Sequence, residues 1–120
     1  MSSDNKSLAL RFLDVATLKK PETLDEIAHP DFMIWDNLQS RDLESQKIAL
    51  SQADRAWAKI EYSVEDIIEE DNKVAIRWKW KGKMVDKSET MQLNGIWFFE
   101  IVDGLIKTIW SSWDQSIFSD

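Results

Sequence analysis

The stretch Leu93–Asp114 constrains the fold more than any other part of the sequence. It consists of two apolar runs on either side of Asp103-Gly104, LNGIWFFEIV and LIKTIWSSWD. Asp-Gly between two such runs is a strong hairpin signal, because a type I′ turn needs a positive φ at both central residues. The stretch therefore predicts two long antiparallel strands.

A two-residue turn also predicts which residues of this hairpin share a face. It places Glu100 opposite Lys107 and Trp97 opposite Trp110, and the opposite charges of the first pair favour that register. Directly opposed residues lie on the same face of a sheet. The register therefore predicts that Asp114 lies on the core face together with Trp97 and Trp110.

Helical periodicity predicts three helices before the strands, over residues 4–19, 22–28 and 42–60. Residues 32–36 alternate as a short extended segment, with Asp36 on the side of its apolar residues Phe32 and Ile34. Residues 37–41 are predicted to form a polar loop.

Residues 62–81 predict a second hairpin, for which two registers compete. A two-residue turn pairs Ile67 with Ile76, whereas a three-residue loop pairs Val64 with Trp78. The three-residue loop is preferred because it matches more apolar residues with each other, and a slip of one residue exposes the wrong face.

This order of elements predicts one α+β domain over residues 1–120, with the helices packed on one face of a curved antiparallel sheet. The net charge of −7 argues against a nucleic-acid partner. The absence of cysteine and the single histidine argue against disulfides and against a metal site built from these residues. We expect neither a metal nor an organic cofactor.

The sequence contains neither an apolar run long enough to span a membrane nor the pattern of a secretory signal. We therefore expect a soluble cytoplasmic protein without a membrane partner.

The last strands are apolar on both faces, although three helices can cover only one of them. This predicts a homodimer through the outer sheet face, on which the hairpin register places Ile96, Phe98, Ile109 and Trp113. The alternative is a sheet that curls enough to cover that face itself.

The segments HPDF, DNKVAIRW and DGLIKTIWSSWD, in this order of elements, resemble the SnoaL-like branch of the NTF2-like superfamily. The resemblance covers about residues 6 to 116. It implies a cone-shaped α+β barrel, often dimeric through the sheet, with a deep pocket between the concave sheet face and the helices. The superfamily includes polyketide cyclases, ketosteroid isomerase and dehydratases. In the cyclases an aspartate on the last strand, a few residues after a tryptophan, acts as acid/base, and Asp114 after Trp110 resembles that position.

Three residues are candidates for acid/base catalysis. A desolvated Asp114 on a tryptophan-lined wall is suited to proton transfer, but it can equally lie in solvent at a strand end. Asp36 is a second candidate, although aspartate also commonly forms caps and turns. His29 is the third, because histidine ionises near neutral pH, but it can instead cap a helix end.

Seven tryptophans against a single tyrosine suggest a wide interior or a ligand-facing wall. Each of them is more often a core residue than a ligand contact, but together they are the predicted ligand-binding residues: Trp35, Trp57, Tyr62, Trp78, Trp80, Trp97 and Trp110. Two function classes remain open. One is an enzyme that isomerises, cyclises or hydrates a small apolar cyclic carbonyl compound, and the other is a non-catalytic ligand-binding or dimeric assembly domain.

Overall fold

The computed structural model describes residues 2–18, 21–37 and 39–119, and it describes their side chains except at 2–3, 16–18, 21, 53–57 and 115–119. The elements follow in the order α1 (Ser2–Leu18), a 3-10 turn (Pro21–Thr23), α2 (Leu24–Ile27), β1 (Ala28–Asp36), β2 (Gln39–Asp42), α3 (Leu43–Ala56), β3 (Trp57–Glu70), β4 (Lys73–Met84), β5 (Glu89–Val102) and β6 (Leu105–Ser119).

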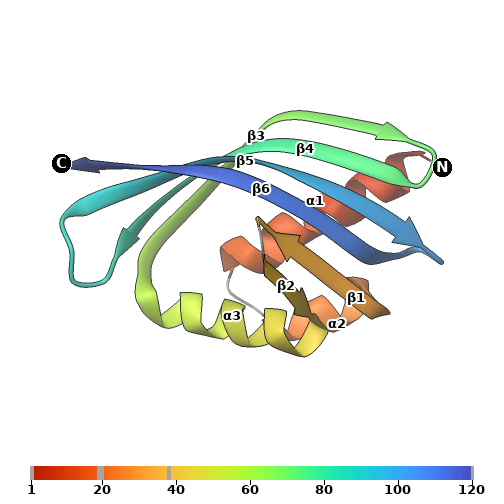
Figure 1. Ribbon diagram of the computed structural model, residues 1–120, viewed down its shortest axis with the longest axis horizontal. Helices are drawn as coiled ribbons and strands as arrows, with labels where there is room; N and C mark the ends of the chain where they lie inside the picture. The colour runs from red at the N-terminus through yellow and green to blue at the C-terminus, as the bar shows by residue number, and fades with distance from the viewer. Residues whose placement is uncertain (1, 19–20, 38, 120) are drawn as a thin grey trace.

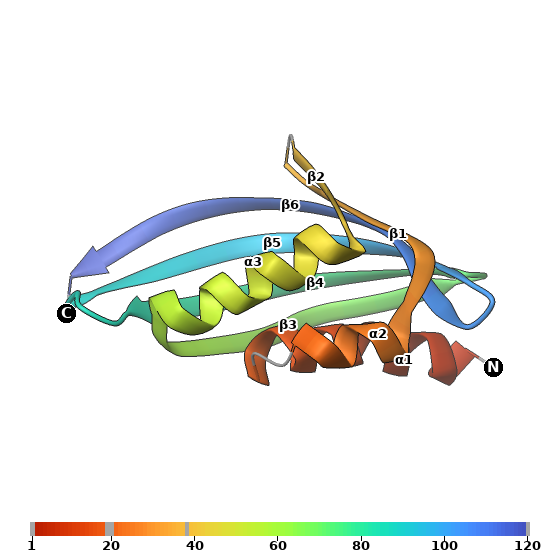
Figure 2. The same cartoon turned by 90° about the horizontal axis from the view of Figure 1, so that it is seen from below.

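The strands form one curved sheet in the order β2-β1-β6-β5-β4-β3, antiparallel except for the parallel pair β1 and β6. Figures 1 and 2 show the helices together on one side of this sheet, where the strands arch over them. The predicted α+β class, with the helices on the concave face, is confirmed. The sheet stays open, with β2 and β3 at its two edges.

The core lies between the concave face and the helices. Helix α1 buries Ala9, Phe12 and Leu13 at helical spacing, and the sheet contributes Ile76 and Phe99, each fully covered. Each fully buried side chain of this size stabilises the fold by about 1.5–3 kcal/mol relative to its exposed form.

Several predicted boundaries were wrong. The second helix, predicted over residues 22–28, is a 3-10 turn followed by the short α2, and the extended segment β1 begins at Ala28 rather than at residue 32. The third helix ends at Ala56 rather than at residue 60, because Ile60 pairs with Gly82 in the β3–β4 ladder. The apolar residues at its end satisfy a helical pattern and a strand pattern equally, and the long ladder decides between them. Residues 39–41 of the predicted loop instead belong to strand β2, which pairs with β1.

The register predicted for the β5–β6 hairpin was also wrong beyond its first two pairs. Ile101 pairs with Ile106 as predicted, but Glu100 pairs with Thr108, so Lys107 is an extra residue in β6. Thr108 Oγ1 donates to Glu100 Oε1 at 3.1 Å in place of the predicted charge pair. This β-bulge exchanges the two faces for all of β6 beyond it.

The exchange has a simple energetic reason. It turns Ile109 into the core, where the side chain is fully buried, and it turns the Asp114 carboxylate outward to an exposed position. The predicted register would instead place a carboxylate against apolar groups and an isoleucine in solvent. Desolvation of the carboxylate opposes that arrangement.

The β3–β4 hairpin contains a second bulge, at Glu65. Near the turn Ile67 pairs with Ile76, so the predicted three-residue loop was wrong there. Beyond the bulge Val64 pairs with Trp78, as the preferred register predicted. Each of the two competing registers therefore describes one half of this hairpin.

The outer face of the sheet carries a continuous row of apolar side chains, one on each of five neighbouring strands. Cross-strand pairing aligns these residues, which we call the outer apolar row: Trp35, Trp110, Phe98, Ala75 and Ile68. The Phe98 and Trp110 rings lie 5.8 Å apart, and 39% and 43% of these two residues are exposed. Among the described residues, none of the helices is both long and apolar enough to cross a membrane.

Candidate functional site

A cavity of about 190 Å³ lies between the concave sheet face and helices α1 and α3. Every strand and both of these helices contribute to its wall. The polar lining consists of Asp36, Arg41, Gln46, Tyr62 and Ser111. The apolar and aromatic lining consists of Phe12, Ile34, Leu50, Trp78, Leu93, Trp97 and Trp113.

The carboxylate of Asp36 is the acidic group of this cavity. Asp36 ends β1 and precedes Asn37, whose φ of 56° allows the tight turn into β2. That turn brings Arg41 back along the strand, so that Arg41 Nη2 lies 3.0 Å from Asp36 Oδ2. The indole N–H of Trp113 donates to the other oxygen, Oδ1. Both carboxylate oxygens are therefore held by donors from other strands.

Two further hydrogen bonds hold the Arg41 side chain and the turn at Asn37 in place. Arg41 Nε donates to Gln46 Oε1 at 2.7 Å, and Gln46 is a buried residue of α3. Asn37 Oδ1 accepts the backbone N–H of Trp113 at 3.1 Å. About a quarter of each side chain in the Asp36–Arg41 pair is exposed, so the pair lies at the boundary between core and solvent.

Tyr62 reaches the same cavity from β3. Burial raises the pKa of its phenol well above the ordinary range, and the negative charge of Asp36 adds to this shift. Its ring meets Trp78 edge-on at 5.7 Å and Trp97 at 5.5 Å. The phenol is therefore a neutral hydrogen-bond donor at neutral pH.

The predicted catalytic residues do not gather in one place. Asp36 faces the cavity, whereas Asp114 is exposed and pairs with Asn94 on the outer face, because of the bulge at Lys107. His29 lies seven positions before Asp36 on β1, roughly 20 Å away along an extended strand. Its Nδ1 accepts the backbone N–H of Asp31 at 3.0 Å.

The predicted aromatic wall is partly rearranged as well. Tyr62, Trp78 and Trp97 line the cavity. Trp35 and Trp110 belong to the outer apolar row, so the expectation that they face a pocket was wrong. Strand alternation explains Trp35, and the bulge explains Trp110.

Two tryptophans lie elsewhere. Trp80 is a buried core residue that packs over Gly82, outside the cavity wall. The side chain of Trp57 lies outside the described residues.

Sequence reasoning missed Arg41, Gln46 and Trp113. Trp113 was assigned to the outer face, together with Ile109, by the register that proved wrong. Arg41 was placed in a polar loop, although Asn37 offered a signal for a hairpin, since asparagine tolerates the left-handed conformation that tight turns require. Gln46 has no local signal, because its partner belongs to another element.

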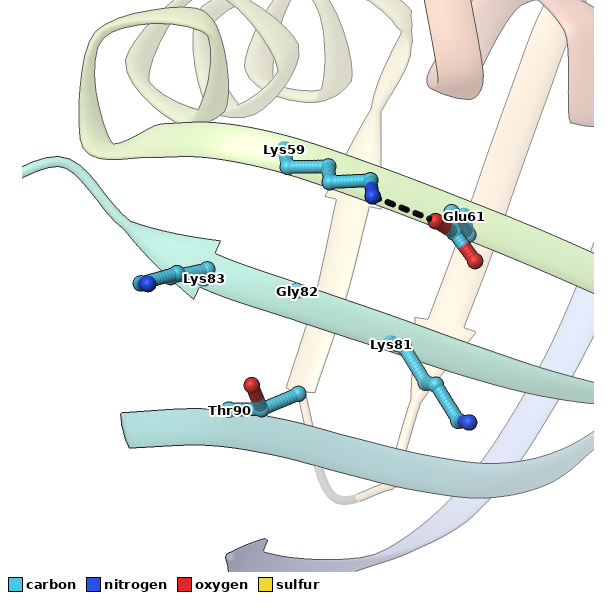
Figure 3. Close-up of a pocket in the computed structure, with 6 residues that line it drawn as sticks. All are labelled: Lys59, Glu61, Lys81, Gly82, Lys83 and Thr90. Atoms are coloured by element: carbon cyan, nitrogen blue, oxygen red, sulfur yellow. Dashed lines mark ion pairs between the residues drawn. The ribbon is translucent and has the colours of Figure 1, made fainter. Parts of the chain in front are cut away.

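A larger hollow of about 450 Å³ lies over strands β3, β4 and β5. Figure 3 shows its lining residues, with Lys59 turned toward Glu61: Lys59, Glu61, Lys81, Gly82, Lys83 and Thr90. The side chains of Lys59 and Glu61 are 73% and 58% exposed, so charges there are screened by solvent. The smaller cavity, with its half-buried carboxylate and aromatic wall, is better suited to bind and desolvate a small molecule.

Comparison with known proteins identifies the architecture. A model of the SnoaL-like domain matches residues 9–109, and the search of curated proteins finds no match. TsrD from Streptomyces laurentii is 22% identical with a TM-score of 0.81, over 93% of this chain and 89% of that one. An LEH-like epoxide hydrolase from M. tuberculosis is 15% identical with a TM-score of 0.81, over 94% and 84%. An NTF2-like protein of unknown function from Cytophaga hutchinsonii is 16% identical with a TM-score of 0.70, over 92% and 89%. At these identities the likeness to solved structures shows the fold.

Proposed function

The chain belongs to the SnoaL-like domain family, and from that premise we propose that its aromatic cavity binds a small cyclic carbonyl compound and that Asp36 transfers a proton of this ligand. The cavity is smaller than the usual range of about 300–1,000 Å³ for ligand pockets, which favours a ligand with a single ring. The apolar body of the ligand would lie against Trp78 and Trp97.

The observation that carries this proposal is the position of the Asp36 carboxylate. It faces an aromatic cavity, and its two oxygens are fixed by Trp113 and Arg41. A base held in one orientation needs little reorganisation before it removes a proton, which is how positioning lowers a barrier.

The proposed step is abstraction of a proton from the carbon next to the carbonyl. The proton moves to a carboxylate oxygen of Asp36, and the C–H electron pair forms a carbon–carbon double bond as the carbonyl oxygen becomes an enolate. The neutral phenol of Tyr62 would donate to that oxygen. Return of the proton to a different carbon gives isomerisation, and attack of the enolate on a second carbonyl of the ligand gives cyclisation.

The direct test is hydrogen–deuterium exchange of cyclohexanone in D2O, followed by NMR with the wild-type protein, D36N and D114N. Wild-type protein should accelerate the exchange at the α-carbons, and D36N should lose about a hundredfold or more of that acceleration. D114N tests the other candidate carboxylate and should keep the wild-type exchange rate. A loss confined to D114N would contradict the assignment to Asp36, and binding of cyclohexanone without exchange in the wild type would favour a non-catalytic binding domain.

One observation favours assembly as a second role. The outer apolar row leaves large apolar side chains exposed on the face that the helices do not cover. We propose that a second copy of the chain covers this row in a homodimer. Ile96 and Phe98 remain candidates for the interface, as the sequence predicted, whereas the buried Ile109 and the inward-facing Trp113 are replaced by Trp35 and Trp110.

A further inference from the structure

We propose that Trp78 determines which ligands the cavity accepts, because its indole N–H is an unpartnered donor for an oxygen of the ligand. This inference rests on the proposed function and names a chemical requirement of the same site. The required ligand is a neutral ring compound that carries an acceptor oxygen, such as a ketone, and a hydrocarbon of the same shape should bind more weakly.

The evidence begins with the indole nitrogen itself. Trp78 lines the cavity and is only 3% exposed, yet its Nε1 has no hydrogen-bond partner among the described residues. Buried donors in native proteins are nearly always paired, and an unpaired one lowers stability. An acceptor atom of a bound molecule would remove this penalty and would be favoured for that reason.

The surroundings of Trp78 fix the indole in place. Its ring lies directly over Gly95, where an added Cβ would be 2.4 Å from Cζ2 and 2.8 Å from Cε2, the carbon bonded to Nε1. The ring of Trp97 lies 5.1 Å away on the same wall. A donor held in this way loses little conformational freedom when a ligand binds, so its hydrogen bond contributes to affinity.

The donors of the cavity lie apart from its carboxylate along the order of the sheet. Trp78 and Tyr62 come from β4 and β3 at one edge, whereas Asp36 comes from β1 near the other edge. Tyr62 lines the same cavity and offers the hydroxyl of a neutral phenol as a second donor. A ligand whose carbonyl oxygen points toward β3 and β4 would therefore direct the carbon next to the carbonyl toward Asp36, as the proposed proton transfer requires.

The test compares two probes of the same shape, cyclohexanone and methylenecyclohexane, in which a carbonyl oxygen is replaced by a CH₂ group. NMR titration measures the Kd of both probes for the wild-type protein and for W78F, which keeps an aromatic ring but removes the N–H. W78F should raise the Kd of cyclohexanone about tenfold, which is the effect of losing one hydrogen bond. It should leave the Kd of methylenecyclohexane within about twofold of the wild-type value. I48V, which changes an exposed residue of α3 outside both the cavity lining and the outer apolar row, is the control and should change neither value.

A second measurement needs no variant. The indole ¹H resonance of Trp78 in the wild-type protein, assigned by its contacts with Gly95 and Tyr62, should move downfield with cyclohexanone and not with methylenecyclohexane. Equal affinity of W78F and wild type for cyclohexanone, or an unmoved resonance while cyclohexanone binds, would overturn the role of Trp78 and leave the proposed function standing. Failure of both probes to bind the wild-type protein would overturn both proposals.

Discussion

The indole N–H of Trp113 donates a hydrogen bond to Oδ1 of Asp36, 77 positions earlier in the chain. The contact joins the end of β1 to a strand that reaches this position only because the bulge at Lys107 turns Trp113 inward. A backbone irregularity in one hairpin therefore completes the polar network in the cavity.

Replacement of Trp113 by phenylalanine removes this donor and keeps an aromatic ring. Because a hydrogen bond to a charged group is worth more than a neutral one, we expect W113F to lower the free energy of unfolding by about 1–2 kcal/mol, somewhat reduced by the partial exposure of Asp36. Urea unfolding measures this change. I48V on the exposed surface of α3 serves as the control and should stay within about 0.5 kcal/mol of wild type, so equal losses in the two variants would argue against a specific role of the Trp113–Asp36 contact.

Tyr62 offers a spectroscopic test, because it is the only tyrosine of the chain. Its pKa is raised by burial and by Asp36, so the folded protein keeps a phenol proton that the unfolded chain releases at a pH of about 10. The stabilisation that this provides is complete below that pH and is lost as the pH rises above it. Tyrosinate absorbance should therefore appear at higher pH in the folded protein than in urea. Ionisation of the folded protein near pH 10 would contradict the desolvation of this phenol by the cavity wall.

Alanine substitutions at Gly95 and at Gly104 should lower the stability of the fold for two different physical reasons. In G95A the new Cβ would lie 2.4 Å from the Trp78 ring, so the indole must shift, and we expect a loss of about 1–3 kcal/mol. In G104A the space around the Cβ is open but φ is +75°, so backbone strain alone should cost about 1–2 kcal/mol. Calorimetry measures both losses.

Ligand binding separates the two glycine variants further. G95A should also weaken binding of cyclohexanone, because it displaces the indole that lines the cavity. G104A lies in the distant Asp103-Gly104 turn and should leave that binding unchanged. Normal binding by a folded G95A would argue against a fixed position of Trp78.

The proposed homodimer predicts an effect of charge in the outer apolar row. W110K places an ammonium group within the row, next to Phe98, where a second copy would have to desolvate it. Light scattering after size exclusion should give a dimeric mass for the wild type and a monomeric mass for W110K at the same concentration. Replacement of the exposed Lys83, which lies away from this row, is the control. A monomeric wild type at high micromolar concentration would contradict the proposal.

Local chemistry in the sequence was sufficient for the helices, the two long hairpins and the fold class, but not for strand β2. The Asp103-Gly104 turn forms as predicted, with φ values of 55° and 75°, and the strand on each side of it is present. The alternation of Phe32, Ile34 and Asp36 also placed the carboxylate of Asp36 on the buried side of β1. These features depend on residues close together in the chain, whose turn preference and period of two are visible in the sequence.

The faces of the long hairpins depended on the tertiary structure. A bulge at Lys107 or Glu65 has no strong local signal, because it is selected by which side chains the whole sheet buries against the helices. One inserted residue moved Asp114 to solvent and Trp113 to Asp36. The sequence by itself therefore determined that this is a SnoaL-like α+β sheet with a carboxylate at the end of its first strand. Only tertiary packing decided which tryptophans surround that carboxylate, because core burial, and not local pairing, sets the register.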